Sequence, residues 1–184
     1  MVRHPSLMCL LISLLPLGFG CATVEKPTAT FRGMDVADIT PHGFTMNVDL
    51  DVHNPNAVSL PLTDAEYTLS LGGVNVVENS KIRPDARIPA HGTGPVTIPI
   101  PVSFENLLAA AKNIRQGGGK VQWGIDAGLN FETGLPILGV QHVPIRHEGT
   151  LDVRELLTRN GGTILTSPAA RELAQEVLGG IFKY

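Results

Sequence analysis

Residues 44–56 read FTMNVDLDVHNPN, a run in which apolar and polar side chains alternate until a proline interrupts it. A β-strand points successive side chains to opposite faces, so this run predicts a strand with one buried face and one solvated face. Pro55 has no backbone N–H and restricts Asn54 to extended backbone, while Asn54 and Asn56 can close a turn with their own side chains. The strand must therefore end in a corner, and other strands must cover its apolar face.

The chain has 184 residues, of which 43% are hydrophobic and 17% are charged. These values suit one globular domain plus a targeting segment. The formal net charge is -3, and no cluster of Lys and Arg is present that could replace the counterions of a phosphate backbone. The composition therefore argues against a nucleic-acid partner.

The N-terminus has the three-part layout of a signal peptide, predicted over residues 1–20. Arg3 lies in a short polar start, and an apolar run of 11 residues, 7–17, follows it. Such a run is too short for a permanent membrane-spanning helix, which needs about 20 residues. The alternatives at this point are a lipoprotein signal, an ordinary cleaved signal and a retained anchor.

The residues around Cys21 resemble a bacterial lipobox, with Gly20 just before the cysteine and Leu17 four positions before it. Gly18 departs from this pattern, because leucine is commonest there. The resemblance implies that Cys21 receives a diacylglycerol, that the chain is cut before it, and that the new amino end takes an acyl chain such as palmitate. The predicted partner is then a lipid bilayer. Ala22 after the cysteine implies the outer membrane of the cell envelope, facing the periplasm.

Further alternating runs, separated by turn signals, predict strands over residues 30–40, 60–71, 74–78, 96–102, 120–131 and 140–153. Gly33 suggests a bulge, and Gly72-Gly73 suggests a hairpin turn. Pro99 and Pro101 share one face, which places their strand at a sheet edge. The fold class expected is mainly β: an antiparallel immunoglobulin- or fibronectin-like sandwich with one embedded helix and a C-terminal helical extension.

The embedded helix is predicted over residues 104–115, with Ser103 as its N-cap. A capping box at Asp152 opens a short helix to Arg159, and Asn160-Gly161-Gly162 should stop it. Pro168 opens a further helix to Phe182, which either packs on the sandwich or a neighbour or lies on a membrane. The chain thus divides into signal peptide (1–20), lipidated tether (21–29), sandwich (30–153) and helical extension (154–184).

An ordered set of short motifs resembles the WHy (water stress and hypersensitive response) domain of group 2 late embryogenesis abundant proteins. The set comprises residues 52–56 (VHNPN), 67–69 (YTL) before Gly72-Gly73, 88–92 (IPAHG), and the closing Phe131, Pro136, Gly139, Pro144 and 149–151 (GTL). The resemblance covers about 31–153. It implies a folded two-sheet sandwich with one helix and a role in desiccation, cold or other stress.

No residues converge in a pattern that predicts catalysis, a cofactor or a metal site. The 117–120 stretch (GGGK) lacks the first glycine and the Ser/Thr of a phosphate loop, so it is interpreted as a helix stop and turn. The mature histidines lack metal-ligand spacing, and His142 and His147 should face opposite sides of a strand. These histidines are His42, His53, His91, His142 and His147.

Two further features have a structural and a functional interpretation. Asp49 and Asp51 share the polar face of the central strand. This spacing could indicate a calcium site or a carboxylate pair as in glycosidases, but the favoured interpretation is a solvated strand face. Trp123 continues an apolar stripe, which favours a core position over a ligand platform.

Asn54, Pro55 and Asn56 form the one motif considered as a binding site. The favoured interpretation is a structural corner, and the alternative is a surface that presents amides to water, sugars or a client backbone. The function expected is a non-enzymatic envelope lipoprotein that protects stress-labile client proteins or membranes by weak binding. The alternatives are an envelope adaptor that docks one partner through a sheet edge or the C-terminal helix, and carbohydrate or peptidoglycan binding through the loop ends.

Overall fold

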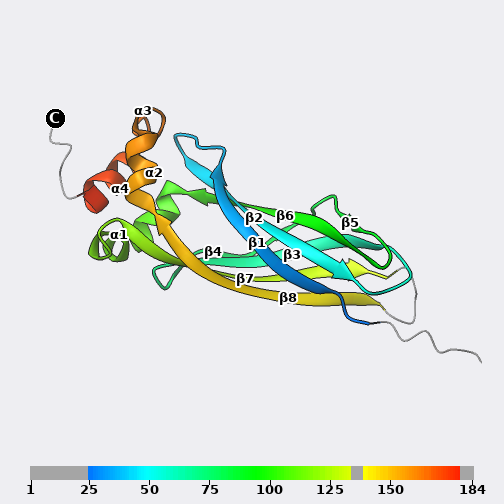
Figure 1. Ribbon diagram of the computed structural model, residues 1–184. Coiled ribbons are helices and arrows are strands. Elements are labelled where there is room, and N and C mark those ends of the chain that lie inside the picture. Colours follow the sequence, from blue (N-terminus) through cyan, green and yellow to red (C-terminus); the bar gives the residue numbers. More distant parts are fainter. Residues whose placement is uncertain (1–24, 134–138, 179–184) are drawn as a thin grey trace, which may run out of the picture.

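The computed structural model describes residues 25–133 and 139–178, in which two antiparallel β-sheets pack face to face and helices gather at one end (Figure 1). This arrangement confirms the predicted mainly β sandwich. The signal peptide and Cys21 lie outside the described residues. None of the described helices is long and apolar enough to cross a membrane.

The smaller sheet contains three strands in the order β1-β2-β6, namely β1 (Thr28–Ala37), β2 (Gly43–Asn54) and β6 (Gly92–Ser103). The alternation predicted for the central strand is confirmed, because the apolar side chains of β2 are buried and its polar ones are at least partly exposed until the corner. A register shift at Gly33 confirms the bulge. Strand β1 begins two residues before the predicted start at residue 30 and ends at Ala37, before the predicted end at residue 40, and Thr28 pairs with His53.

Strand β6 lies at the edge of this sheet, as the prolines predicted. Pro95, Pro99 and Pro101 all occupy alternate positions of β6 and pair with β2 on one side only. Backbone N–H groups alternate in direction along a strand, so these three prolines remove donors from the same, free side. The edge is thereby protected against pairing with another chain.

The larger sheet has the order β4-β3-β7-β8, with β5 paired to the start of β3. Its strands are β3 (Leu60–Leu71), β4 (Val74–Ile82), β5 (Arg87–Ile88), β7 (Lys120–Glu132) and β8 (Val140–Asp152). Gly72 and Gly73 both have positive φ, 58° and 79°, which confirms the hairpin turn. Residues 134–138 after β7, which include Pro136 of the family-like motif set, lie outside the described residues.

The facing sides of the two sheets form the core. Trp123 is 4% exposed, which confirms its predicted core position. Its indole ring lies directly under Gly149, where a Cβ atom would come within 2.7 Å of the ring. The glycine of β8 therefore lets the strand cross closely over the tryptophan.

The helical end contains α1 (Phe104–Gln116), α2 (Val153–Arg159), α3 (Gly161–Ile164) and α4 (Pro168–Leu178). The two predicted caps are confirmed: the Ser103 hydroxyl accepts from the Asn106 N–H at 3.1 Å, and the Asp152 carboxylate accepts from the Glu155 N–H at 2.9 Å. Asn160 ends α2 as expected. However, a further turn, α3, begins at once, because the Asn160 carbonyl accepts from Thr163 N–H at 3.0 Å.

Helix α4 packs against α1 and buries its apolar stripe of Ala170, Leu173, Ala174 and Val177. An ion pair between Arg115 and Glu176, 2.6 Å apart, ties the two helices at the surface. The C-terminal helix therefore packs on the fold, and its apolar stripe is not free to lie on a membrane. Its predicted end at Phe182 lies outside the described residues.

Candidate functional site

Asn54 sits in the corner that ends β2 and is fully buried, with 0% exposure. Its Nδ2 donates to the carbonyl of Val58 at 2.8 Å and to that of Pro89 at 3.0 Å. Its Oδ1 accepts from the backbone N–H of Asn56 at 3.0 Å and from the Asn56 Nδ2 at 3.1 Å. One amide thus joins the 54–58 loop to the segment before β6.

Asn56 uses its own amide to hold the start of the described chain. Its Nδ2 donates to the carbonyl of Glu25 at 2.8 Å, and its Oδ1 accepts from the Glu25 N–H at 2.8 Å. The side chain therefore pairs with Glu25 as a neighbouring strand would. The backbone carbonyl of Asn56 also accepts from His91 N–H at 2.9 Å.

These contacts decide between the two interpretations of Asn54, Pro55 and Asn56. Asn56 is only 7% exposed, and both amides form hydrogen bonds within the protein. A surface that presents free amides to water, sugars or a client is therefore wrong, and the motif is a structural corner. Every buried side-chain N or O atom in the described part of the chain has a hydrogen-bond partner, so the corner is fully satisfied.

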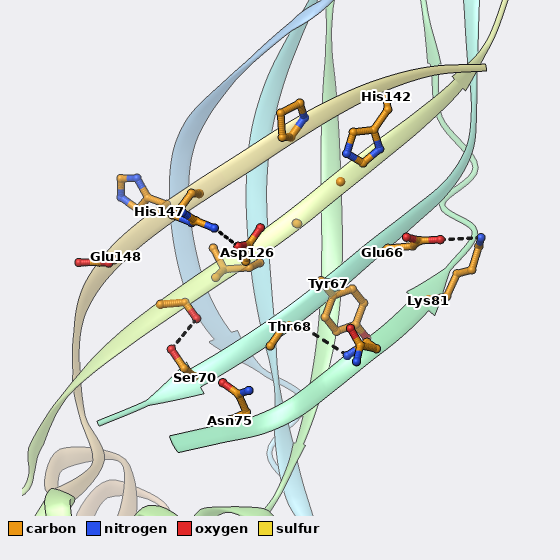
Figure 2. A pocket seen from close by; sticks show the side chains of 17 residues that line it. Glu66, Tyr67, Thr68, Ser70, Asn75, Lys81, Asp126, His142, His147 and Glu148 are labelled. Carbon is orange, nitrogen blue, oxygen red and sulfur yellow. Dashed lines mark hydrogen bonds and ion pairs between the residues drawn. The ribbon is translucent and has the colours of Figure 1, made fainter. Parts of the chain in front are cut away.

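A groove of about 660 Å³ lies on the outer face of the larger sheet, across β4, β3, β7 and β8 (Figure 2). Two outward positions of β7 in its floor are glycines, so neighbouring side chains lie directly against the backbone there. A Cβ atom at Gly128 would lie 2.2 Å from the ring of His142, and one at Gly124 would lie 3.0 Å from the Ser70 hydroxyl. This groove was not predicted. The signal in the sequence was the outward series Gly124, Asp126, Gly128 and Asn130, which alternates glycine with polar residues.

The walls of the groove are polar and form mutual pairs, several of them visible in Figure 2. Lys81 Nζ lies 2.9 Å from Glu66 Oε1 and 3.2 Å from Asp64 Oδ1, and the Arg146 guanidinium forms an ion pair with Asp126. Hydrogen bonds with Glu66 and Asp64 raise the pKa of Lys81, and the hydrogen bond to Asp126 raises the pKa of Arg146. The cations therefore stay charged at any physiological pH.

Asp64 is the buried acid of this network, with 8% exposure. Burial by itself raises its pKa. The hydrogen bonds from Asn130 Nδ2 (2.7 Å) and Lys81, with the charges of Lys81 and Arg83, outweigh that effect and hold the pKa below its ordinary value. Asn130 in turn contacts His142 Nδ1 at 2.9 Å. The chain Lys81, Asp64, Asn130, His142 thus links all four strands under the groove.

The remaining candidates take the structural roles that the sequence favoured. Asp49 accepts from the Thr97 hydroxyl at 2.5 Å, and Asp51 pairs with Arg32 at 3.4 Å, so the two carboxylates have separate partners. Among the described residues, no three His, Cys, Asp or Glu side chains are grouped to hold a metal ion.

The histidines and the glycine run follow the same pattern. His147 stacks on Phe31 with ring centroids 3.6 Å apart, on the face opposite His142, as predicted. The 117–119 glycines end α1 and turn into β7, with positive φ at Gly118 and Gly119, which confirms the helix stop and turn. The groove itself, lined by ion pairs and by the hydroxyls of Thr68 and Ser70, can make weak polar contacts.

The fold and part of the sequence are shared with known proteins. A desiccation-related protein of Craterostigma plantagineum is 27% identical over 130 residues, covering 71% of this chain and 83% of the relative. A late embryogenesis abundant protein of Gossypium hirsutum is 22% identical over 135 residues, covering 73% and 87%.

Solved structures show the same fold. The solution structure of an Arabidopsis thaliana protein has a TM-score of 0.58 at 21% identity and covers 71% of this chain and 83% of that one. A crystal structure from Archaeoglobus fulgidus has a TM-score of 0.53 at 13% identity and covers 71% and 97%.

A profile of late embryogenesis abundant proteins matches residues 49–149, more than half of the chain. The match runs from the central strand β2 to Gly149 and so includes both the Asn-Pro-Asn corner and the groove. The chain therefore belongs to the late embryogenesis abundant protein family LEA_2.

Proposed function

We propose that this protein is a non-enzymatic, lipid-anchored stress protectant of the bacterial envelope. The observation that carries the proposal is membership of a family of late embryogenesis abundant proteins, with a desiccation-related relative that covers most of the chain. The lipobox-like sequence at Cys21 supplies the anchor. The resemblance to WHy domains points to the same role in water stress.

The groove on the larger sheet is the surface proposed to contact clients. Its ion pairs are formed internally, so a client does not need to bring a particular charge. Exposed ion pairs contribute little to stability and can exchange partners at low cost. The expected contacts are therefore weak and broad, as protection of unrelated proteins requires.

Two features weigh against the adaptor alternative. The apolar stripe of α4 is buried against α1 and cannot enter the groove of a partner. The free edge of β6 carries three prolines and resists strand addition.

The proposal is tested by drying or freeze-thawing two unrelated labile enzymes with residues 22–184, and with an equal mass of an inert protein. Recovered activity should be clearly higher with the protein for both enzymes. Recovery no better than that with the inert protein contradicts the proposal.

A matched pair of variants tests the groove. The double variant Asp126→Ala, Arg146→Ala removes an exposed ion pair from the groove and should reduce protection. The control Arg32→Ala, Asp51→Ala removes an exposed ion pair from the outer face of the smaller sheet and should leave protection unchanged. Both variants keep the net charge, so equal effects from the two would assign protection to general surface properties.

A further inference from the structure

The exit of the tether is fixed by the side chain of Asn56. Both backbone groups of Glu25 are bonded to this amide at 2.8 Å, and Asn56 is itself held by the buried Asn54. Four residue steps separate Cys21 from Glu25. A fully extended chain spans at most about 3.6 Å per residue, so Glu25 lies within roughly 14 Å of Cys21.

The same end of the sandwich carries exposed apolar side chains. Among the described residues, the exposed large hydrophobic side chains are Val58, at 37%, and Val140, at 58%. The carbonyl of Val58 is bonded to Asn54 in the corner. Val140 pairs with Glu132 at the last position of β7, and the starts of β1 and β8 lie at the same end of the sandwich (Figure 1).

The helices lie at the opposite end of the long strands (Figure 1). Strand β7 has 13 residues and leads from α1 to the end that carries Val140. At about 3.4 Å per residue it spans roughly 44 Å. A tether of roughly 14 Å therefore cannot reach a bilayer that touches only the helical end.

The two broad faces of the sandwich are unfavourable for an anionic bilayer. The outer face of the smaller sheet carries three acidic side chains, Asp35, Asp49 and Asp51. Among the described residues of this face that form a side-chain hydrogen bond or ion pair, one is a cation, Arg32. In and under the groove, acidic side chains outnumber cationic ones: Asp64, Glu66, Asp126 and Glu148 against Lys81 and Arg146. Like charges repel the lipid phosphates from both faces, whereas exposed valines gain from contact with the interface.

We propose that the Asn-Pro-Asn end, defined by Val58 and Val140 with the Asn56–Glu25 clamp, rests on the lipid headgroups while the helical end is held away from the bilayer. This inference depends on the proposed acylation of Cys21. It places the long axis of the sandwich upright, so the groove opens to the side and remains accessible to clients.

The mature chain offers a direct test, because Cys9 leaves with the signal peptide and Cys21 is acylated, which leaves no free thiol. Single cysteines are introduced at Val58→Cys and Val140→Cys, at Asp35→Cys and Glu148→Cys on the broad faces, and at Glu172→Cys on α4. Each lipidated variant carries an environment-sensitive fluorophore and is reconstituted into phosphatidylethanolamine–phosphatidylglycerol vesicles that contain a headgroup quencher.

The expected result is strong quenching at positions 58 and 140 and little at 35, 148 and 172. Equal or stronger quenching at 35 or 148 means that the domain lies flat, and it overturns the inference while the anchor stands. If the wild-type protein fails to float with the vesicles, both the proposed acylation of Cys21 and the inference that depends on it are contradicted. The unlipidated chain 22–184 is the control and should show no quenching at any position.

Discussion

The two ends of the sandwich are closed by opposite kinds of interaction. At the helical end, apolar side chains of α1 and α4 fill the space between the helices, and Leu107, Ile114 and Leu173 are fully buried. At the Asn-Pro-Asn end, two buried amides hold the chain by hydrogen bonds, and valines stay exposed.

This difference determines which amino-acid substitutions each end of the sandwich tolerates. Hydrophobic contact is non-directional and scales with the area removed from water, so the helical end accepts any apolar side chain of suitable volume. Buried amides require donors and acceptors at set positions, so the corner accepts few substitutions. Stability should therefore depend on volume at one end and on atom type at the other.

The largest effect is expected at the helical end. Leu173→Ala removes a fully buried side chain from α4 and should lower the free energy of unfolding by about 2–5 kcal/mol. The neighbouring exposed residue offers a control, since Glu172→Ala should change it by less than about 0.5 kcal/mol. Urea denaturation measures both. A similar, small loss for both variants would mean that α4 does not close the core.

The burial of α4 also affects truncation experiments. Deletion of residues 168–184 would expose the apolar face of α1 as well as remove the helix. Point variants on the exposed face of α4, such as Glu172→Ala, therefore test a role of the C-terminal helix in binding more cleanly.

The next effect is expected at the corner. Asn54→Ala leaves the carbonyls of Val58 and Pro89 and the amide of Asn56 without partners, which should cost about 3 kcal/mol. Asn54→Asp keeps the volume and the acceptor but places a second acceptor against two carbonyls, so it should not restore stability at neutral pH. Denaturant titration of both variants tests this, and an Asn54→Asp protein as stable as wild type would contradict the role of atom type.

A smaller effect is expected for Asn56→Ala, because Asn56 is nearer the surface and its lost partners can reach water. The expected loss is about 1–2 kcal/mol. The distinguishing measurement is hydrogen exchange of the Glu25 amide, which should lose its protection in the variant. Asn47→Ala, whose amide makes only a 3.5 Å contact with Asp35, is the control, and protection of Glu25 should remain there.

The smallest effect concerns pH. Hydrogen bonds and cations hold the pKa of Asp64 below its unfolded value, so the folded state favours the ionised carboxylate. Its contribution to stability is present above the unfolded pKa, about 3.9, and is lost as pH falls through the lower, folded pKa. Stability measured between about pH 5 and 2 should therefore fall less steeply in Asp64→Asn than in wild type. If the unfolding free energies of the two proteins changed with pH by the same amount, the ionisation of Asp64 would not be coupled to folding.

The strands and caps followed from local patterns. The alternation in β2, the prolines of β6 and the caps Ser103 and Asp152 each indicate their structure because the cause lies within a few residues. The sequence does not predict helix α3, which begins directly after Asn160, because glycine at this position normally ends a helix.

The groove and the tether clamp were decided by tertiary structure. The glycines of β7 become a groove floor only because β3, β4 and β8 place polar side chains around them. Asn56 meets Glu25 across 31 positions of sequence, and no local pattern encodes that contact.

The sequence alone thus determined the strand faces, the edge, the caps and the family resemblance, because side-chain periodicity and backbone restrictions are local properties. Only the tertiary structure decided what the Asn-Pro-Asn motif does, since an asparagine amide can face solvent or carbonyls with equal ease. Its partners here, Val58, Pro89 and Glu25, come from separate segments that the sandwich brings together.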